Sequence, residues 1–144
     1  MLLNLDPVLT GRVLLALDEM GHGDAVVIAD AHFTASKLAR KHLIDLPGLS
    51  SPRVLKAIRS VMVPDDYGPA LDLMEAPDGP LPVQQELVAA ADLGTCESRF
   101  VERFAFYDLA AQAELIIRTG ETRVYGNALF RKGVTPVSDA WTLA

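Results

Sequence analysis

The sequence predicts a single α/β domain over residues 1–144, with one sheet covered by helices on both faces. Two apolar runs, at residues 25–29 and 115–117, are unbroken and rich in β-branched side chains. Such runs are typical of strands buried on both faces, which need a layer of helices on each side. Helical segments alternate with strand-like segments along the chain, as in layered helix–sheet–helix domains. The order of the strands cannot be derived from one sequence.

The first third of the chain predicts one helix, one strand and an irregular segment. Thr10 is a suitable N-cap for a helix over residues 11–20, and Gly21 is suitably placed to end it. A tight glycine-containing turn then leads into the apolar run at residues 25–29. Residues 30–50 are expected to be irregular, because they carry many polar groups and a Pro-Gly break.

The middle of the chain predicts two helices on either side of a strand. Ser51 is expected to cap a helix whose first position is Pro52 and whose apolar stripe continues to Met62. Turn residues separate this helix from a strand at residues 71–75. Residues 83–91 again have helical periodicity.

The last part of the chain predicts a further helix and three extended segments. Residues 99–105 alternate in polarity and are expected to be extended, and a short helix is expected over residues 106–113. The apolar run at residues 115–117 is the second buried strand. Residues 125–130 are expected to form the last strand.

Composition and charge exclude several classes of function. The formal net charge is −6 and the isoelectric point is about 4.9, which argues against a nucleic-acid partner and against binding to anionic membranes. No apolar run approaches the roughly 20 residues that span a bilayer. Cys96 is the only cysteine, so no intrachain disulfide can form, and the first residues do not resemble a signal peptide. We therefore expect a cytoplasmic protein.

The first group of candidate functional residues surrounds the strand at residues 25–29. His22 lies between two glycines just before this strand, and a histidine is suited to proton transfer near neutral pH. The alternative is an ordinary turn histidine that faces solvent. Asp30 follows the strand at its other end, where ligands gather in α/β sheets. Because a strand of this length spans roughly 20 Å, His22 and Asp30 can share a site only if the chain bends back or two subunits build the site together.

A metal site is the competing interpretation of the same region. It could draw on histidines and carboxylates that are all legitimate ligands, namely His22, Asp24, Asp30, His32 and His42. Their spacing does not place two imidazoles on one metal face, so we predict no metal.

Two further groups have the composition of a sugar site. Arg103 opens an aromatic stretch that ends at Tyr107, and Tyr125, Gly126 and Asn127 form a triplet near the end of the chain. Arg and Asn side chains hydrogen-bond to hydroxyl groups, and aromatic rings pack against the C–H face of a sugar. Alternatively, these aromatic residues belong to the core, and Gly126 marks a bulge or a close backbone approach.

The motifs, taken in order, resemble the sugar mutarotase family that contains L-fucose mutarotase and D-ribose pyranase. They are Gly21-His22-Gly23-Asp24, Asp30-Ala31-His32-Phe33, Arg103-Phe104-Ala105-Phe106-Tyr107, Thr119-Gly120-Glu121, Tyr125-Gly126-Asn127 and Lys132-Gly133-Val134. The resemblance runs from about residue 5 to residue 136 and is stronger to the fucose branch. It implies an isomerase that interconverts the α and β anomers of L-fucose or a similar monosaccharide.

The resemblance also implies roles for individual residues. His22 would be the acid/base residue, while Asp30, Arg103 and the triplet Tyr125, Gly126 and Asn127 would bind the sugar. It further implies ring-shaped homo-oligomers, decamers or octamers, with sites at subunit interfaces.

The chemistry expected of such a site is acid/base catalysis without a cofactor. Anomer exchange opens and closes a hemiacetal, which involves neither redox chemistry nor hydrolysis. We expect Tyr125 to assist His22 as a proton donor, and Phe106 or Tyr107 to meet the methyl group of a 6-deoxy sugar. Three alternatives remain open: a sugar-binding or regulatory module without catalysis, a ribose-type pyranase and a metal-dependent hydrolase.

Overall fold

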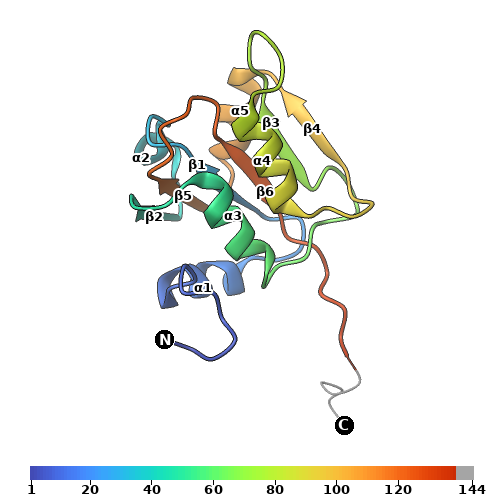
Figure 1. Cartoon of the computed structure of the whole chain (residues 1–144). Helices are drawn as coiled ribbons and strands as arrows, with labels where there is room; N and C mark the ends of the chain where they lie inside the picture. The colour runs from blue at the N-terminus through green and yellow to red at the C-terminus, as the bar shows by residue number, and fades with distance from the viewer. Residues whose placement is uncertain (139–144) are drawn as a thin grey trace.

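The computed structural model describes residues 1–138 and contains one six-stranded sheet (Figure 1). The strands are β1 (Ala25–Ala29), β2 (His42–Leu46), β3 (Leu71–Met74), β4 (Ser98–Val101), β5 (Leu115–Thr119) and β6 (Ala128–Arg131). The helices are α1 (Gly11–Glu19), α2 (Ala35–Leu38), α3 (Ser51–Arg59), α4 (Pro82–Ala91) and α5 (Arg103–Ala110). The predicted α/β class is thereby confirmed. The predicted domain also includes residues 139–144, which lie outside the described residues.

The strand order is β2-β5-β1-β6-β3-β4. The pairs β1–β5, β2–β5 and β3–β4 are parallel, whereas β6 is antiparallel to both β1 and β3. Five strands therefore run in one direction, and β6 runs against them in the middle of the sheet. Their five carboxyl ends and the amino end of β6 meet at one edge, which we call the carboxyl edge.

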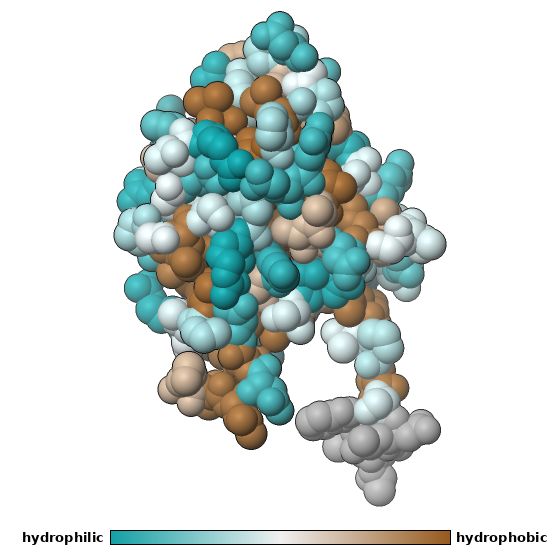
Figure 2. All heavy atoms as spheres, in the orientation of Figure 1, coloured by the Kyte–Doolittle hydropathy of each residue, from teal (hydrophilic) through white to brown (hydrophobic). Residues whose placement is uncertain are grey.

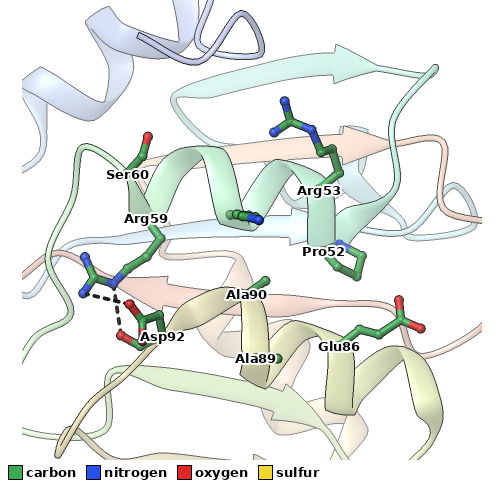
Figure 3. Close-up of a pocket in the computed structure, with 9 residues that line it drawn as sticks. Pro52, Arg53, Arg59, Ser60, Glu86, Ala89, Ala90 and Asp92 are labelled. Atoms are coloured by element: carbon green, nitrogen blue, oxygen red, sulfur yellow. Dashed lines mark hydrogen bonds and ion pairs between the residues drawn. The ribbon is translucent and has the colours of Figure 1, made fainter. Parts of the chain in front are cut away.

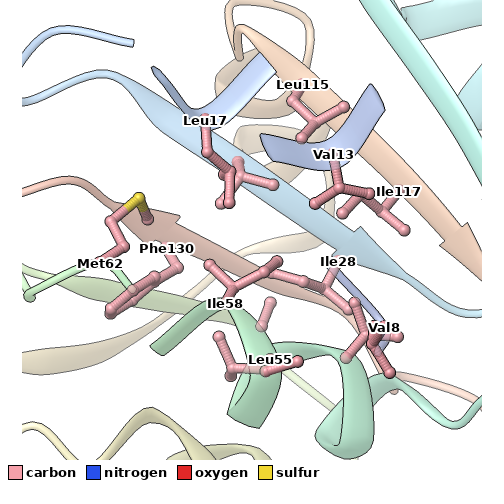
Figure 4. Close-up of a cluster of buried hydrophobic side chains, with 14 of the residues drawn as sticks. Val8, Val13, Leu17, Ile28, Leu55, Ile58, Met62, Leu115, Ile117 and Phe130 are labelled. Carbon is pink, nitrogen blue, oxygen red and sulfur yellow. The ribbon is translucent and has the colours of Figure 1, made fainter. Parts of the chain in front are cut away.

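Alternate side chains of the central strands feed two separate cores, as expected for a sheet buried on both faces. Val26 and Ile28 of β1 pack with α1, α3 and α4 on one face (Figure 4). Val27 and Ala29 pack with α2 and α5 on the other. The helices lie on the same two sides of the sheet in Figure 1. The two predicted buried runs are confirmed, because every residue of β1 after Ala25 is buried and so are Leu115, Ile116 and Ile117.

Two helix boundaries differ from prediction. Thr10 caps α1 as expected, with its hydroxyl accepting from the backbone N–H of Val13 at 3.4 Å. The helix ends at Glu19, however, because Met20 is already extended, and Gly21 is not in the left-handed conformation of a glycine stop. For α3 the cap is Ser50, which accepts from Arg53 N at 3.4 Å, and not Ser51. Ser51 is instead the first helical residue.

The segment predicted to be irregular contains two elements. α2 is only four residues long, too short to show a helical period, and β2 lies at an edge of the sheet. Three of the five β2 residues are half-buried and Asp45 is exposed, so β2 lacks the apolar run of a central strand. Its polar side chains pair across the surface instead, Asp45 with Arg118 at 2.7 Å and His42 with Glu19 at 2.8 Å.

Two boundaries near the candidate site also differ. The predicted extended segment at residues 99–105 ends at Val101, and Arg103 already begins α5, because Glu102 caps that helix by accepting from Phe104 N and Ala105 N. The last strand begins at Ala128 and not at residue 125. Tyr125 has φ +61, a left-handed conformation that no strand accommodates. Among the described residues, no helix is both long and apolar enough to cross a membrane.

Candidate functional site

A small pocket opens at the carboxyl edge of the sheet. Its volume is about 230 Å³, and its polar lining consists of Asp30, His32, Arg103, Tyr107, Tyr125 and Asn127. Its apolar lining consists of Phe33, Met74 and Val124. The sheet topology explains the grouping, because these residues lie at or just beyond the carboxyl ends of β1, β3 and β4 or in the segment that leads into β6. Pockets for drug-sized ligands occupy roughly 300–1,000 Å³, so this one suits a smaller molecule.

Asp30 and Asn127 form the buried floor of the pocket. Both are 3% exposed. Asn127 Oδ1 accepts from the backbone N–H of Asp30, and Asn127 Nδ2 donates to Asp30 Oδ2, both at 2.8 Å. The other carboxylate oxygen of Asp30 accepts from the backbone N–H of His32 at 3.0 Å. Burial disfavours the charged form and raises the pKa of Asp30, although these hydrogen bonds oppose the shift.

Arg103 and Tyr107 line the pocket from α5. They lie one helical turn apart, and Arg103 Nε donates to the Tyr107 hydroxyl at 3.1 Å. The Arg103 guanidinium also lies 5.6 Å from the centre of the Tyr107 ring and 5.8 Å from that of Phe104. Contacts over aromatic faces favour such a cation. Arg103 and Tyr107, which the sequence suggested for one site, line the same pocket, and they do so from a helix and not from a strand.

The loop between β5 and β6 carries the predicted triplet, of which Tyr125 and Asn127 line the pocket and Gly126 does not. Tyr125 lines the pocket in its left-handed conformation. Gly126 lies against the loop itself, since a Cβ there would lie 2.8 Å from Glu121 Cγ, 3.1 Å from Arg123 O and 3.2 Å from Ser51 Oγ. Gly126 thus marks the close approach that was one of its two interpretations, and it shapes the loop from inside.

The apolar lining corrects one expectation. Phe106 is fully buried in the core and does not line the pocket, so it cannot meet a sugar methyl group. Tyr107 does line it, together with Phe33 and Met74. Sequence reasoning did not single out Met74, although it falls within the strand predicted at residues 71–75. The rule that ligands gather at the carboxyl ends of strands could have drawn attention to it.

His32 also lines the pocket, and its ring is exposed. Its Nε2 lies 3.3 Å from the backbone oxygen of Thr122, so the ring is held against the β5–β6 loop. The other ring nitrogen, Nδ1, has no contact among those described and is available to a ligand. Nothing in the residue pattern around His32 distinguishes a ligand contact from a surface position.

His22 lies at the opposite edge of the sheet. It sits in the turn before β1, exposed, with its ring 5.4 Å from that of Tyr67. The turn is fixed by Gly23, which has φ +83 and donates its N–H to Lys132 O at 2.7 Å. Within one chain, therefore, His22 does not join Asp30, Arg103, Tyr125 and Asn127. Asp24 is also in this turn, where its carboxylate accepts from Gly21 N at 2.7 Å.

The residues of the metal interpretation are divided between the two edges of the sheet, with His22 and Asp24 before β1 and Asp30 and His32 after it. Within residues 1–138, no three His, Cys, Asp or Glu side chains gather closely enough to hold a metal ion. His42 pairs instead with Glu19, at 2.8 Å, on the edge strand β2.

A larger groove of about 770 Å³ lies between α3 and α4 (Figure 3). Charged residues dominate it, and this face of the molecule is largely hydrophilic in Figure 2. Its side chains make contacts with protein groups: Arg59 Nε donates to the backbone oxygens of Ala91 and Asp92 at 3.1 and 3.2 Å, and Arg53 pairs with Asp6. Most charged side chains of the groove are thus engaged with protein groups, whereas the pocket at the carboxyl edge brings together four of the candidate residues, Asp30, Arg103, Tyr125 and Asn127.

Comparison with known proteins gives consistent matches. Residues 3–135 match the model of the RbsD / FucU transport protein family. The L-fucose mutarotase of Glaesserella parasuis serovar 5 (strain SH0165) is 40% identical over 144 residues, which cover 95% of this chain and 98% of the relative.

Solved structures agree. The fucose mutarotase of Streptococcus pneumoniae, in complex with L-fucose, superposes with a TM-score of 0.84 at 28% identity, covering 94% of this chain and 100% of the other. FucU from Bifidobacterium longum gives a TM-score of 0.82 at 33% identity, with 91% and 98% covered.

Proposed function

Since the chain belongs to the RbsD / FucU family, we propose that it is a mutarotase that interconverts the α and β anomers of L-fucose or a closely similar monosaccharide. One observation carries the proposal. Four residues that the sequence set apart, Asp30, Arg103, Tyr125 and Asn127, line one small pocket in a chain 40% identical to an L-fucose mutarotase.

The proposed reaction opens and recloses the sugar ring. A base takes the proton of the anomeric hydroxyl, the bond between the anomeric carbon and the ring oxygen breaks, and an acid protonates the ring oxygen. The product is an open-chain aldehyde. After rotation about the bond next to the carbonyl, the same two proton transfers run in reverse and close the ring on the other face. Atoms and protons balance, and no electrons are transferred to or from the sugar.

The pocket supplies groups for binding and for one proton transfer. The carboxylate of Asp30 accepts hydrogen bonds from sugar hydroxyls, and Arg103 donates them. Asn127 acts chiefly through Asp30, whose carboxylate it holds in place. The hydroxyl of Tyr125, which lines the pocket, is the proton donor at one reacting oxygen. Phe33, Met74 and Tyr107 offer apolar surface for the methyl group of a 6-deoxy sugar.

His22 supplies the second proton transfer, from a neighbouring chain. It is exposed at the opposite edge of the sheet in its own subunit, so it can reach a pocket only where two chains meet. A ring-shaped homo-oligomer, with the carboxyl edge of one subunit facing the His22 turn of the next, meets this requirement. Decamers and octamers are the assemblies we propose, and we place the reaction in the cytoplasm.

NMR saturation transfer between the anomeric protons of L-fucose tests the function. Wild type should accelerate exchange in the presence of chelator. Both His22→Ala and Tyr125→Phe should slow it by about 10²–10⁴-fold, the range that positioned acid–base groups supply. His42→Ala, which removes an exposed histidine paired with Glu19, is the matched control and should leave the rate unchanged.

Three results would contradict the proposal. Binding of L-fucose without faster exchange would indicate a binding module. Loss of exchange on chelation would indicate a metal-dependent reaction. Acceleration with D-ribose but not with L-fucose would indicate a pyranase.

A further inference from the structure

The loop that carries Tyr125 is built around a buried carboxylate. Glu121 is 4% exposed, although its neighbours Thr122 and Arg123 are exposed. Its Oε1 accepts from the backbone N–H and from Nε of Arg123, at 3.0 and 2.9 Å, and its Oε2 accepts from Nη2 at 2.9 Å. These bonds to Arg123 are the main reason that the pKa of Glu121 is lowered despite its burial, and a backbone N–H of Ser51 at the start of α3 adds to the effect.

The same guanidinium reaches a second carboxylate on another element. Arg123 Nη1 donates to Glu86 Oε1 at 2.7 Å, and Nη2 donates to Glu86 Oε2 at 2.9 Å. Glu86 belongs to α4, which packs on the other face of the sheet from α5. The three residues Glu86, Arg123 and Glu121, here called the Arg123 bridge, thus fasten the β5–β6 loop to α4. Paired, two-bond contacts between arginine and carboxylate fix geometry as well as charge.

The residue that follows Tyr125 in the chain packs directly against this bridge. Gly126 is packed so closely on Glu121 Cγ and Arg123 O that a Cβ would not fit without movement. Tyr125 follows Arg123 by two residues, directly before Gly126, and holds φ +61, a conformation that is unfavourable for an ordinary residue. Such a conformation persists only where the surrounding structure enforces it. The Arg123 bridge fixes the loop on both sides of Tyr125.

We propose that Glu86 is a positioning residue for Tyr125 that acts through Arg123 and Glu121. Glu86 is not among the described residues that line the pocket, and it lies in the outer groove between α3 and α4, where Figure 3 shows its carboxylate projecting from α4. Its effect on the reaction rests on the function proposed above, whereas its effect on the geometry of Tyr125 does not.

Glu86→Gln tests the geometry. It keeps the size of the side chain and removes the charge that holds Arg123. The chain contains three tyrosines, Tyr67, Tyr107 and Tyr125, so 3-fluorotyrosine labelling gives three ¹⁹F resonances that single Tyr→Phe variants assign. The Tyr125 resonance should shift or broaden in Glu86→Gln, while that of Tyr67, at the other edge of the sheet, should not change.

Asp6→Asn is the matched control. Asp6 and Arg53 form a pair of the same kind, with two bonds of 2.8 Å, between the N-terminal segment and α3. Breaking this pair should leave the Tyr125 resonance and the exchange rate as in wild type. An unchanged Tyr125 resonance in Glu86→Gln, or an equal change in Asp6→Asn, would overturn the proposal.

The kinetic test separates positioning from general loss of structure. Glu86→Gln should lower kcat by about tenfold, with KM changed by less than about twofold, because a displaced catalytic group loses rate more than binding. If Glu86 acts through Tyr125, Glu86→Gln should cause no further loss of rate in a Tyr125→Phe protein. The quantity compared is the residual rate of anomer exchange, which His22 still supports in that protein. The same fold-loss in both backgrounds would refute the route through Tyr125. If wild type exchanges no anomers but Glu86→Gln still shifts the Tyr125 resonance, the positioning role of Glu86 stands and the proposed function is wrong.

Discussion

Asn127 makes two hydrogen bonds of 2.8 Å to a single residue, Asp30, one to its backbone and one to its carboxylate. The pair joins residues 97 positions apart in the sequence and connects the end of β1 to the segment that enters β6. Both residues are buried at the floor of the candidate pocket. The orientation of the Asp30 carboxylate is therefore set by the amide of Asn127.

Removing this amide should destabilise the fold. Asn127→Ala leaves a buried N–H and a buried carboxylate oxygen of Asp30 without their partner, and an unmet group of this kind costs about 1–3 kcal/mol. The free energy of unfolding in urea measures the loss. Gln85→Ala removes an exposed amide from α4 and should stay within about 0.5 kcal/mol of wild type. Equal losses in the two variants would contradict the assignment.

The raised pKa of Asp30 predicts a dependence of stability on pH. A carboxyl group whose pKa is higher in the folded state binds its proton more tightly there, so its contribution to stability falls as pH rises from the unfolded value near 3.8 through the folded pKa. Asp30→Asn has no carboxyl group to ionise and therefore does not lose this stability as pH rises. The stability of Asp30→Asn relative to wild type should therefore increase as pH rises above 3.8, until the folded carboxyl group has titrated. A difference that stays constant, or that decreases, would be inconsistent with the raised pKa.

Glu121 should show the opposite sign. Arg123 lowers the pKa of its carboxyl group, so the stabilisation is complete above the unfolded value of 4.5 and is lost as pH falls through the folded pKa. Glu121→Gln should be less stable than wild type at neutral pH, and the difference should shrink in acid. Urea titrations of both proteins at a series of pH values measure this. A difference that grows in acid would show that the bond to Arg123 does not stabilise the fold.

Gly126→Ala should damage both stability and activity. The added methyl group would meet Glu121 Cγ, Arg123 O and Ser51 Oγ, and overpacking of this kind costs about 1–3 kcal/mol. Gly68→Ala is the control, because a Cβ there has open space and an ordinary backbone conformation. The unfolding temperature and the rate of fucose anomer exchange should both be lower in Gly126→Ala than in Gly68→Ala. Similar behaviour of the two would argue against the tight loop.

Mixed assemblies test whether two chains build each site. His22→Ala and Asp30→Asn should each abolish most exchange when expressed alone. Co-expressed in equal amounts, they should recover about a quarter of wild-type activity, since half of the pockets keep Asp30 and half of those face an intact His22. If His22 and Asp30 served the same pocket from one chain, no mixed pocket would be intact and activity would stay at the level of the single variants.

The sequence was sufficient for the parts of the fold that are fixed by burial. β1 and β5 were predictable because they are apolar on both faces, and α1, α3 and α4 because their apolar positions recur at helical spacing. β2 was not predictable, because it is an edge strand whose polar side chains pair on the surface, and it therefore lacks a continuous apolar run. Arg103 was placed in an extended segment because alternation over a few residues also occurs where Glu102 caps a helix.

For the candidate site, residue types could be predicted but not their arrangement. Asp30 could be predicted as a site residue because it follows a buried strand. The distance between His22 and the pocket could not, because it depends on how two chains would be arranged next to each other. The left-handed conformation of Tyr125 has no signature in its residue type. It depends on the contacts of Glu121, Arg123 and Gly126, which come together only when the loop closes on α3 and α4.

The position of β6 has a consequence for synthesis of the protein. β6 is the last of the described strands in chain order, yet it lies between β1 and β3 in the middle of the sheet. Until residues 128–131 leave the ribosome, β1 and β3 each have an unpaired edge, and the sheet consists of two halves that share no strand. We expect the sheet of the nascent chain to remain open until this strand is available. Closure then joins both halves in one late, cooperative step.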